Sequence, residues 1–302
     1  MNTTLVLGIL LLASTFAQAQ ATRTWVSATG DDANTCGRKD PCVTFAGALA
    51  KTSKGGVISV IDPGGYGPVT ITQSVTIDAG GMYASILAPN DINGIIVNAD
   101  DKDVVVLRGL TIFGVGSGTD GIKFINGARL HVEDCRISGF TSRGINFAPT
   151  GKSELLVKDS VIRENGAAGI LSLPAGGAAS VAVNNCRLEA NANGVSAQDD
   201  TQMTVRDSIV ANNSLNGFLV LSSTESTQMN IESCVSTNNG AAGIKTSGVG
   251  GNTGTVRISN VTVTNNATGL LAGSGGSIES FKNNTIAGNT TNGAPSTSFN
   301  QQ

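Results

Sequence analysis

Along most of this chain of 302 residues, apolar and polar positions alternate in short stretches, and Gly, Asn or Asp ends each stretch. Such alternation is typical of β-strands that bury one face. One recurring unit places Gly between a small or polar residue and an apolar one, and its glycines lie 23 to 27 residues apart. These glycines are Gly94, Gly121, Gly144, Gly169, Gly194, Gly217, Gly243, Gly269 and Gly293.

A second unit lies between these glycines and has the order apolar, any residue, Asp/Asn/Ser, small, any residue, apolar. Val132–Ile137 and Val157–Ile162 are two examples, and an Asn such as Asn165 or Asn191 often follows a few residues later. Each period therefore predicts short strands that are separated by turns. The first apolar positions predict one buried column, made of Val132, Val157, Val183, Val205, Ile231, Ile258 and Phe281.

This repeat favours one fold class. Dense β-branched residues and frequent Gly exclude helical repeats, the Leu-x-x-Leu-x-Leu frame of leucine-rich solenoids is missing, and a β-sandwich would not repeat its turns at one period. We therefore predict an all-β, right-handed, three-sheet parallel β-helix (a solenoid), because parallel crossovers are right-handed. Its rungs would lie about 4.8 Å apart, so that equivalent side chains form ladders along the axis.

The pattern divides the chain into four segments. Residues 22–56 would cap the first rung, because Phe45 and Leu49 predict a short amphipathic capping helix within 44–51 that Gly55 ends. Residues 57–293 would form the β-helix. We expect the short polar segment 294–302 to be a flexible tail, and segment 1–21 to be a signal peptide.

The signal peptide is predicted from an apolar run, Leu5–Ala13, that is followed by small residues at Ala17, Ala19 and Ala21. Cleavage is expected after Ala19 or Ala21. The run is shorter than the roughly 20 residues that span a bilayer, although an uncleaved anchor is the alternative because the segment lacks Lys and Arg before the run. We expect a secreted or periplasmic protein with no membrane insertion after signal cleavage.

Composition narrows the range of partners. With 40% hydrophobic residues and a net charge of −3, the chain does not have the composition of a disordered protein. Mild acidity without clusters of Lys or Arg argues against nucleic acid as a partner. An outward apolar strip is the remaining signal for a partner, although a covering loop is an equal alternative. Its residues are Leu171, Leu173, Leu219 and Leu221.

The five cysteines fall into two groups. Cys36 and Cys42 lie close together in a polar loop, and we predict a disulfide between them in an exported protein; a two-ligand metal site is the weaker alternative. Cys135, Cys186 and Cys234 share one inward column with serines on the rungs between them. Cysteines two rungs apart, roughly 9.6 Å, are too distant for a disulfide, so we expect three buried free thiols.

Four short motifs point to a family: Trp25–Asn34, Pro41–Phe45, Gly64–Gly67 and Thr76–Gly81. Together with the repeat, they make most of the mature chain resemble the pectate-lyase-like superfamily, and in particular its secreted bacterial right-handed parallel β-helix repeat proteins. The resemblance implies an exported protein of a superfamily whose members often act on acidic polysaccharides. Fold-level resemblance is weak evidence for an activity.

The superfamily's catalytic motifs are largely missing. Polygalacturonase-like hydrolysis needs Gly-His-Gly and Arg-x-Lys, whereas the single His is His131, in Leu-His-Val, and no Arg-x-Lys follows. The Asp-Pro-His of epimerases is absent, since the two Asp-Pro pairs precede Cys42 and Gly64. The paired acids Asp199 and Asp200 favour a polar turn over a glycosidase pair.

Lyase chemistry is the enzymatic option that the sequence leaves open. It needs a basic residue that takes the proton α to a uronate carboxylate, often with Ca²⁺ to neutralise that carboxylate. The candidate catalytic residues, expected to point outward from consecutive rungs, are Arg136, Arg163 and Arg187. The candidate substrate-binding residues beside them are Lys158, Glu133 and Glu189. Such a lyase would take Ca²⁺ as a cofactor, and the sequence predicts no other metal site.

The opposite interpretation of these charges is a solvated salt-bridge ladder. It rests on an outward column of mixed sign, made of Arg108, Glu133, Lys158, Asn184, Arg206 and Glu232. Three functions follow as hypotheses, and whether the protein is an enzyme stays open among them. The first is binding of an extracellular or cell-surface polysaccharide. The alternatives are a polysaccharide lyase acting on polyuronides and a non-catalytic structural surface or matrix protein.

Overall fold

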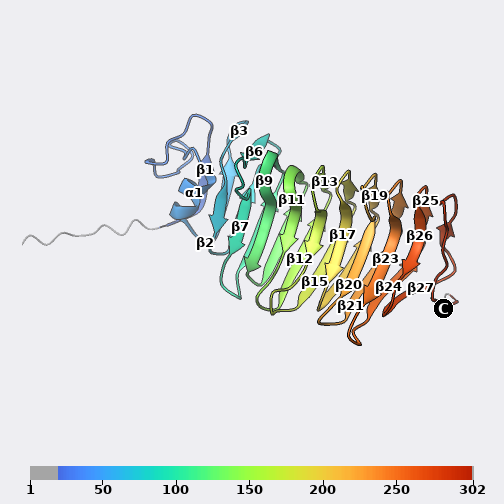
Figure 1. Cartoon of the computed structure of the whole chain (residues 1–302). Coiled ribbons are helices and arrows are strands. Elements are labelled where there is room, and N and C mark those ends of the chain that lie inside the picture. The colour runs from blue at the N-terminus through green and yellow to red at the C-terminus, as the bar shows by residue number, and fades with distance from the viewer. Residues whose placement is uncertain (1–19, 301–302) are drawn as a thin grey trace, which may run out of the picture.

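The alternating stretches form a coil of short parallel strands in the computed structural model, which describes residues 20–300 (Figure 1). Every ladder between neighbouring strands is parallel, which confirms the predicted parallel β-helix. The first 19 residues of the predicted signal peptide lie outside the described residues, so that the signal peptide stays a prediction.

One sheet, called sheet A here, runs the whole length of the coil. Its strands follow each other along the axis, and each comes from a different rung. They are β1 (Ala21–Val26), β2 (Thr52–Val60), β5 (Val75–Asp78), β8 (Val104–Arg108), β10 (Arg129–Glu133), β12 (Ser153–Lys158), β15 (Ala179–Asn184), β18 (Thr201–Arg206), β21 (Thr227–Glu232), β24 (Gly254–Ser259), β27 (Gly276–Ser280) and β29 (Thr297–Ser298).

Two further ladders complete each rung, and the long strands β9 (Leu110–Asn126) and β11 (Arg136–Phe147) bend across both of them. Sheet B contains β3 (Gly64–Gly65), β6 (Ala84–Leu87), the starts of β9 and β11, β13 (Val161–Arg163), β16 (Arg187–Glu189), β19 (Ile209–Ala211), β22 (Val235–Thr237), β25 (Thr262–Thr264) and β28 (Thr285–Ile286). Sheet C contains β4 (Val69–Ile71), β7 (Ile95–Asn98), the ends of β9 and β11, β14 (Ala168–Ser172), β17 (Asn193–Gln198), β20 (Phe218–Ser222), β23 (Ala242–Gly248) and β26 (Thr268–Ala272).

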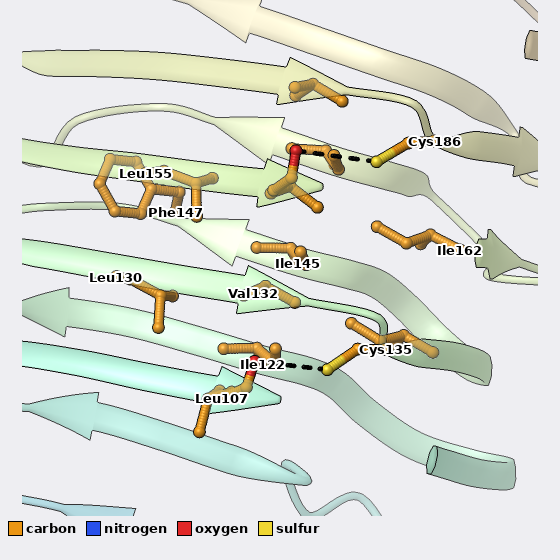
Figure 2. Close-up of a cluster of buried hydrophobic side chains, with 14 of the residues drawn as sticks. Leu107, Ile122, Leu130, Val132, Cys135, Ile145, Phe147, Leu155, Ile162 and Cys186 are labelled. Carbon is orange, nitrogen blue, oxygen red and sulfur yellow. Dashed lines mark hydrogen bonds between the residues drawn. The ribbon is translucent and has the colours of Figure 1, made fainter. Parts of the chain in front are cut away.

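Inward apolar side chains pack in columns along the axis. Leu107, Val132 and Val157 are paired on neighbouring strands of sheet A and are fully buried. Leu107 and Val132 lie in one cluster with Ile122 and Ile145 (Figure 2). Burial of each such side chain stabilises the fold by about 1.5–3 kcal/mol. These columns are the main reason that the rungs stack in one register.

The predicted column holds from Val132 to Ile258, but its last predicted member is wrong. Ile258 pairs with Ser280 and not with Phe281. In the last rung, Thr285 of sheet B follows Ser280 of sheet A by five positions. In an earlier rung, the equivalent residues Arg136 and Val132 are only four positions apart. The last turn therefore contains one additional residue, which shifts the sequence pattern by one position.

The recurring glycines are required by the close approach of successive rungs. A Cβ atom at Gly169 would lie 2.7 Å from the Gly194 carbonyl oxygen, and one at Gly194 would lie 2.7 Å from that of Gly217. No larger residue fits at such distances without a shift of the backbone. A Cβ atom at Gly269 would meet the Asn292 carbonyl oxygen, so Gly293 lies one position outside this column.

Turn residues form ladders of their own. Between sheets A and B, Asp134, Asp159 and Asn185 have φ of 50°, 53° and 49°, a conformation that Asp and Asn tolerate well. Between sheets B and C, buried asparagines bond along the axis. Asn213 Nδ2 donates to Asn239 Oδ1 at 2.9 Å, and the backbone N–H of Asn213 donates to the same oxygen at 3.2 Å. The ladder continues through Asn165, Asn191, Asn213, Asn239, Asn266 and Asn289.

The N-terminal end holds the short helix α1 (Phe45–Lys51). Thr44 is its N-cap and accepts the Gly47 N–H at 2.9 Å, while the Asp32 carboxylate accepts the Val43 and Thr44 N–H groups. The Phe45 ring packs 5.1 Å from that of Tyr66. Strand β1, which lies in the predicted cap segment except for Ala21, pairs with β2 and so extends sheet A by one strand beyond the expected start of the coil.

The predicted disulfide is confirmed. Cys36 and Cys42 are bonded with their Cα atoms 4.7 Å apart, which lies within the usual range for a disulfide. Cys42 also bridges to Val26 of β1. The disulfide therefore ties the loop before α1 to the first strand of sheet A.

The C-terminal segment, which is expected to be a flexible tail, contains a short strand. Strand β29 pairs with β27, and the Phe299 N–H donates to the Ser280 carbonyl at 2.8 Å. The Phe299 and Phe281 rings lie 6.2 Å apart. Residues up to Asn300 thus add a partial rung to sheet A, and the flexibility of this segment stays a prediction.

Candidate functional site

The three arginines singled out in the sequence lie on the exposed outer face of sheet B. Arg136 and Arg187 occupy one column, two rungs apart, with Val161 between them. Arg163 lies in the neighbouring column, paired with Glu189. The arginines therefore share a face but alternate between two columns of it.

Two of these arginines have acidic partners. Arg187 forms a short ion pair with Glu189, and Arg163 Nε lies 3.9 Å from Glu164 Oε1. Within residues 20–300, Arg136 has no such partner. It lines a hollow of about 310 Å³ together with Met82, Tyr83 and Asp134.

Glu133 and Lys158 belong to sheet A, across the turn from the arginines. Arg108 Nε lies 2.9 Å from Glu133 Oε2, and Lys158 Nζ lies 3.6 Å from Glu133 Oε1. Arg108 also reaches Asp78, at 3.4 Å. These contacts match the salt-bridge ladder that the outward column of mixed sign predicts. The charges of Glu133 and Lys158 are therefore compensated by each other and by Arg108.

A larger hollow, of about 450 Å³, lies on the outer face of sheet A. It crosses five neighbouring strands, from β10 to β21, a length of about 19 Å at the usual strand spacing. We call it the groove. Its outward-facing lining residues are Arg129, His131, Glu154, Leu156, Ser180, Ala182, Gln202, Thr204, Gln228 and Asn230.

Side-chain size explains why a groove forms here. The central column runs His131, Leu156, Ala182, Thr204, Asn230, so that two small residues lie between larger ones. Ser180 is the small residue of the adjacent column, next to Gln202. The floor is therefore low over β15 and β18 and rises toward both ends.

Arg129 and Glu154 close one end of the groove as a salt bridge of 2.6 Å between Nε and Oε2. The rest of the lining is neutral: amide, hydroxyl and apolar groups alternate along it. Such a surface can donate hydrogen bonds to ring and hydroxyl oxygens and accept them from hydroxyl groups. Leu156 and Ala182 offer apolar contact to a flat ligand between these polar groups.

His131 is the single His of the chain and lies at this end of the groove. Burial lowers its pKa, against the opposing effect of Glu133, whose Oε1 lies 3.9 Å from Nδ1. Its buried Nε2 has no hydrogen-bond partner. The imidazole is therefore neutral at physiological pH.

The remaining candidate groups are structural. Cys135, Cys186 and Cys234 are buried free thiols, as predicted, and the Cys135 thiol points at the Leu107 carbonyl (Figure 2). Burial raises the pKa of Cys135 to about 12. Between residues 20 and 300, no group of three or more His, Cys, Asp or Glu side chains is placed to hold a metal ion.

Two other groups of residues that the sequence analysis singled out have structural roles. Leu171 and Leu219, expected in an outward apolar strip, are only 6% and 8% exposed. Asp199 and Asp200 form a turn in which the Asp199 carboxylate accepts the Ser223 and Thr224 N–H groups. None of the helices in the described part of the chain is long and apolar enough to cross a membrane.

The groove residues were not singled out in the sequence, apart from His131. Ser180, Gln202 and Gln228 are the first outward positions of their strands, and Ala182, Thr204 and Asn230 the second. Aligning the outward positions of successive repeats would have placed these small and amide side chains together. The sequence analysis followed charge, whereas the groove arises from side-chain volume.

Comparison with known proteins agrees with this architecture. The family model described as right handed beta helix region matches residues 93–254 and 175–291. Pectate lyase Pel9A has a similar structure, with a TM-score of 0.72 and 19% identity over 91% of this chain and 79% of that chain. Alginate lyase from Paenibacillus sp. strain FPU-7 gives a TM-score of 0.61 and 15% identity over 92% of this chain and 98% of that chain.

The enzymatically active domain of tailspike protein 2 from bacteriophage CBA120 gives a TM-score of 0.58 and 13% identity, over 88% of this chain and 44% of that one. At such identities the likeness extends to the fold alone. Comparison with the curated proteins gives no match.

Proposed function

The chain belongs to the right-handed β-helix family, and we propose that it binds an extracellular or cell-surface polysaccharide along the groove of sheet A. The disulfide and the predicted signal peptide support an exported protein. Three solved structures of similar fold carry the names of a pectate lyase, an alginate lyase and a phage tailspike, which supports a polysaccharide as the ligand.

The observation that carries this proposal is the shape and lining of the groove. It runs along the coil axis over five strands, as a linear polymer would require, and its walls present hydroxyl and amide groups at the rung spacing. Sugars combine hydroxyl groups with apolar C–H faces. The alternation of Gln202 and Thr204 with Ala182 and Leu156 matches both.

The test is affinity electrophoresis of the purified mature protein through gels that contain neutral polysaccharides, pectate, alginate or glycosaminoglycans. Retardation by at least one polymer is expected, and Ala182→Trp, which fills the groove, should remove it. Ser277→Trp, on the same outer face but two strands beyond the groove, should retain it. Retardation that Ala182→Trp leaves unchanged, or none with a folded protein, would overturn the proposal and favour a structural surface or matrix role.

Polyuronide lyase activity at Arg136, Arg163 and Arg187 is the second candidate function. The observation in its favour is that Arg136 lacks an acidic partner among the described residues and lines a hollow of about 310 Å³. A guanidinium group there could neutralise a uronate carboxylate. Lys158, Glu133 and Glu189 would contribute less than proposed from the sequence, because each lies in a salt bridge.

Ultraviolet absorbance from unsaturated uronide ends tests this second function, with pectate or alginate as substrate in the presence and absence of Ca²⁺. Product that disappears in Arg136→Ala but persists in Ala182→Trp would establish the lyase. If a folded protein gives no product, this second function is excluded.

A further inference from the structure

The charges around the groove identify the class of glycan that it takes. We propose that the groove selects an uncharged polysaccharide and rejects polyuronides. This inference rests on the proposed function, because it assigns a substrate class to the same groove.

The outer face of sheet A carries matched charges from β5 to β27. Every charged side chain that points outward there lies in a salt bridge with another on a neighbouring strand. The cations are Arg108, Arg129, Lys158, Arg206 and Arg257. The anions are Asp78, Glu133, Glu154, Glu232 and Glu279. Each cation on this face therefore already has an acidic partner.

Exposed acidic residues lie along both rims of the groove. The turns from sheet A to sheet B along the groove hold the exposed residues Asp134, Asp159 and Asp207. The loops that lead from sheet C into the same strands, 148–152, 173–178, 199–200 and 223–226, hold Asp199, Asp200 and Glu225 against the single cation Lys152. A polyanion would meet a net negative charge at the rim formed by the sheet C loops, whereas the aspartates of the other rim are followed on sheet B by Arg136, Arg163 and Arg187.

The floor also lacks a positive charge. The amides of Gln202, Gln228 and Asn230 can hydrogen-bond to hydroxyl groups, but neither they nor the neutral imidazole of His131 compensate an ionised carboxylate. A carboxylate that loses water on binding, without a cation as partner, weakens the complex. Since each uronate residue carries one carboxylate, the penalty would be repeated along the polymer.

The experiment compares polymers that share a backbone and differ in charge. Binding of the full-length mature protein is measured by calorimetry for polygalacturonate and alginate, for their carboxyl-reduced neutral derivatives, and for xylan, mannan and galactan. We expect at least one neutral polymer to bind and each polyuronide to bind at least about tenfold more weakly than its reduced derivative. Affinity for the neutral polymer should not change with salt concentration, because no ion pair forms.

The groove variant separates failure of this inference from failure of the proposed function. A polyuronide could bind more tightly than its reduced derivative, with Ala182→Trp abolishing that binding. In that case the inferred preference for neutral polymers is wrong, and the groove remains the binding site. If binding persists in Ala182→Trp, or if no polymer binds, the proposed function fails as well. Gln202→Ala is a milder variant that should weaken the neutral polymer severalfold without filling the groove.

Discussion

Arg129 Nε and Glu154 Oε2 lie 2.6 Å apart on adjacent strands of sheet A, at one end of the groove. Neither residue is close in sequence to the other. Each stands at the first outward position of its rung, so the pair exists only because the rungs stack in register. Their charges cancel at the point where a ligand would enter the groove.

Removal of one partner should change what the groove binds. In Glu154→Gln the charge of Arg129 is uncompensated, and we expect a gain of polyuronide binding that salt weakens. The free energy of unfolding should fall by less than about 1 kcal/mol, because the pair is half-exposed. Calorimetry with polygalacturonate at low and high salt measures the gain, and Asp78→Asn, two strands outside the groove on the same face, is the matched control. Equal polyuronide binding by the wild type and Glu154→Gln would contradict this role of the pair.

The glycine column should not tolerate a methyl group. A Cβ atom at Gly194 would lie 2.1 Å from Val210 Cγ1 and 2.7 Å from the Gly217 carbonyl oxygen. We expect Gly194→Ala to lower the free energy of unfolding by about 1–3 kcal/mol. Gly151→Ala is the control, since its Cβ atom would meet only Asn126 Oδ1, at 3.8 Å. Urea unfolding of both variants checks this; similar midpoints for the two would show that the rungs can separate without strain.

The buried thiols make stability depend on alkaline pH. Burial raises the pKa of Cys135 to about 12 and those of Cys186 and Cys234 to about 11, against about 8.5 for a thiol in the unfolded chain. Above about pH 8.5 the unfolded chain therefore releases protons that the folded chain keeps, and stability falls as pH rises. We expect a decrease of up to about 1.4 kcal/mol per pH unit for each thiol until the folded pKa is reached.

Guanidinium unfolding between pH 8 and pH 10 measures this decrease. The matched variant replaces all three cysteines by serine, which the same column already accepts at Ser160 and Ser208. Its stability should depend less on pH over this range. An equal slope for the wild type and the variant would assign the alkaline loss to other groups.

Loss of the disulfide should act locally. The Cys36–Cys42 bond closes a short loop, and its removal by Cys36→Ser with Cys42→Ser should destabilise the N-terminal end by about 2 kcal/mol. In a solenoid each rung contacts only its neighbours, so distant rungs should be unaffected. Hydrogen exchange is expected to quicken in β1 and α1 but not in β18 or β21. Uniformly faster exchange would indicate that the coil unfolds as one unit.

The rung pattern could be predicted from the sequence because each column repeats a residue type. The glycines, the buried asparagines and the inward valines recur once in each rung, so the register of most rungs could be predicted from the repeat. The pattern slipped in the last rung, where Ser280 and not Phe281 continues the column. An additional residue in a single turn has no second copy from which it could be recognised.

The groove could not be predicted in the same way. It depends on Ala182 and Thr204 being smaller than Leu156 and Asn230, residues that come together from separate rungs. Charge was the more visible signal, and it led to Arg136 on sheet B. The salt-bridge ladder of sheet A was predicted as one interpretation of its outward column, whereas the Arg129–Glu154 pair of the groove was not.

The direction of the backbone hydrogen bonds has a mechanical consequence. They run along the coil axis between rungs, and β1 and β29 lie at opposite ends (Figure 1). Tension between the two ends would therefore load one rung at a time, as in the opening of a zipper, and not shear all rungs together. Each rung released, 23 to 27 residues, would add about 80 Å of contour length. Under load the coil would therefore extend in steps, one rung at a time, before the whole chain is unfolded.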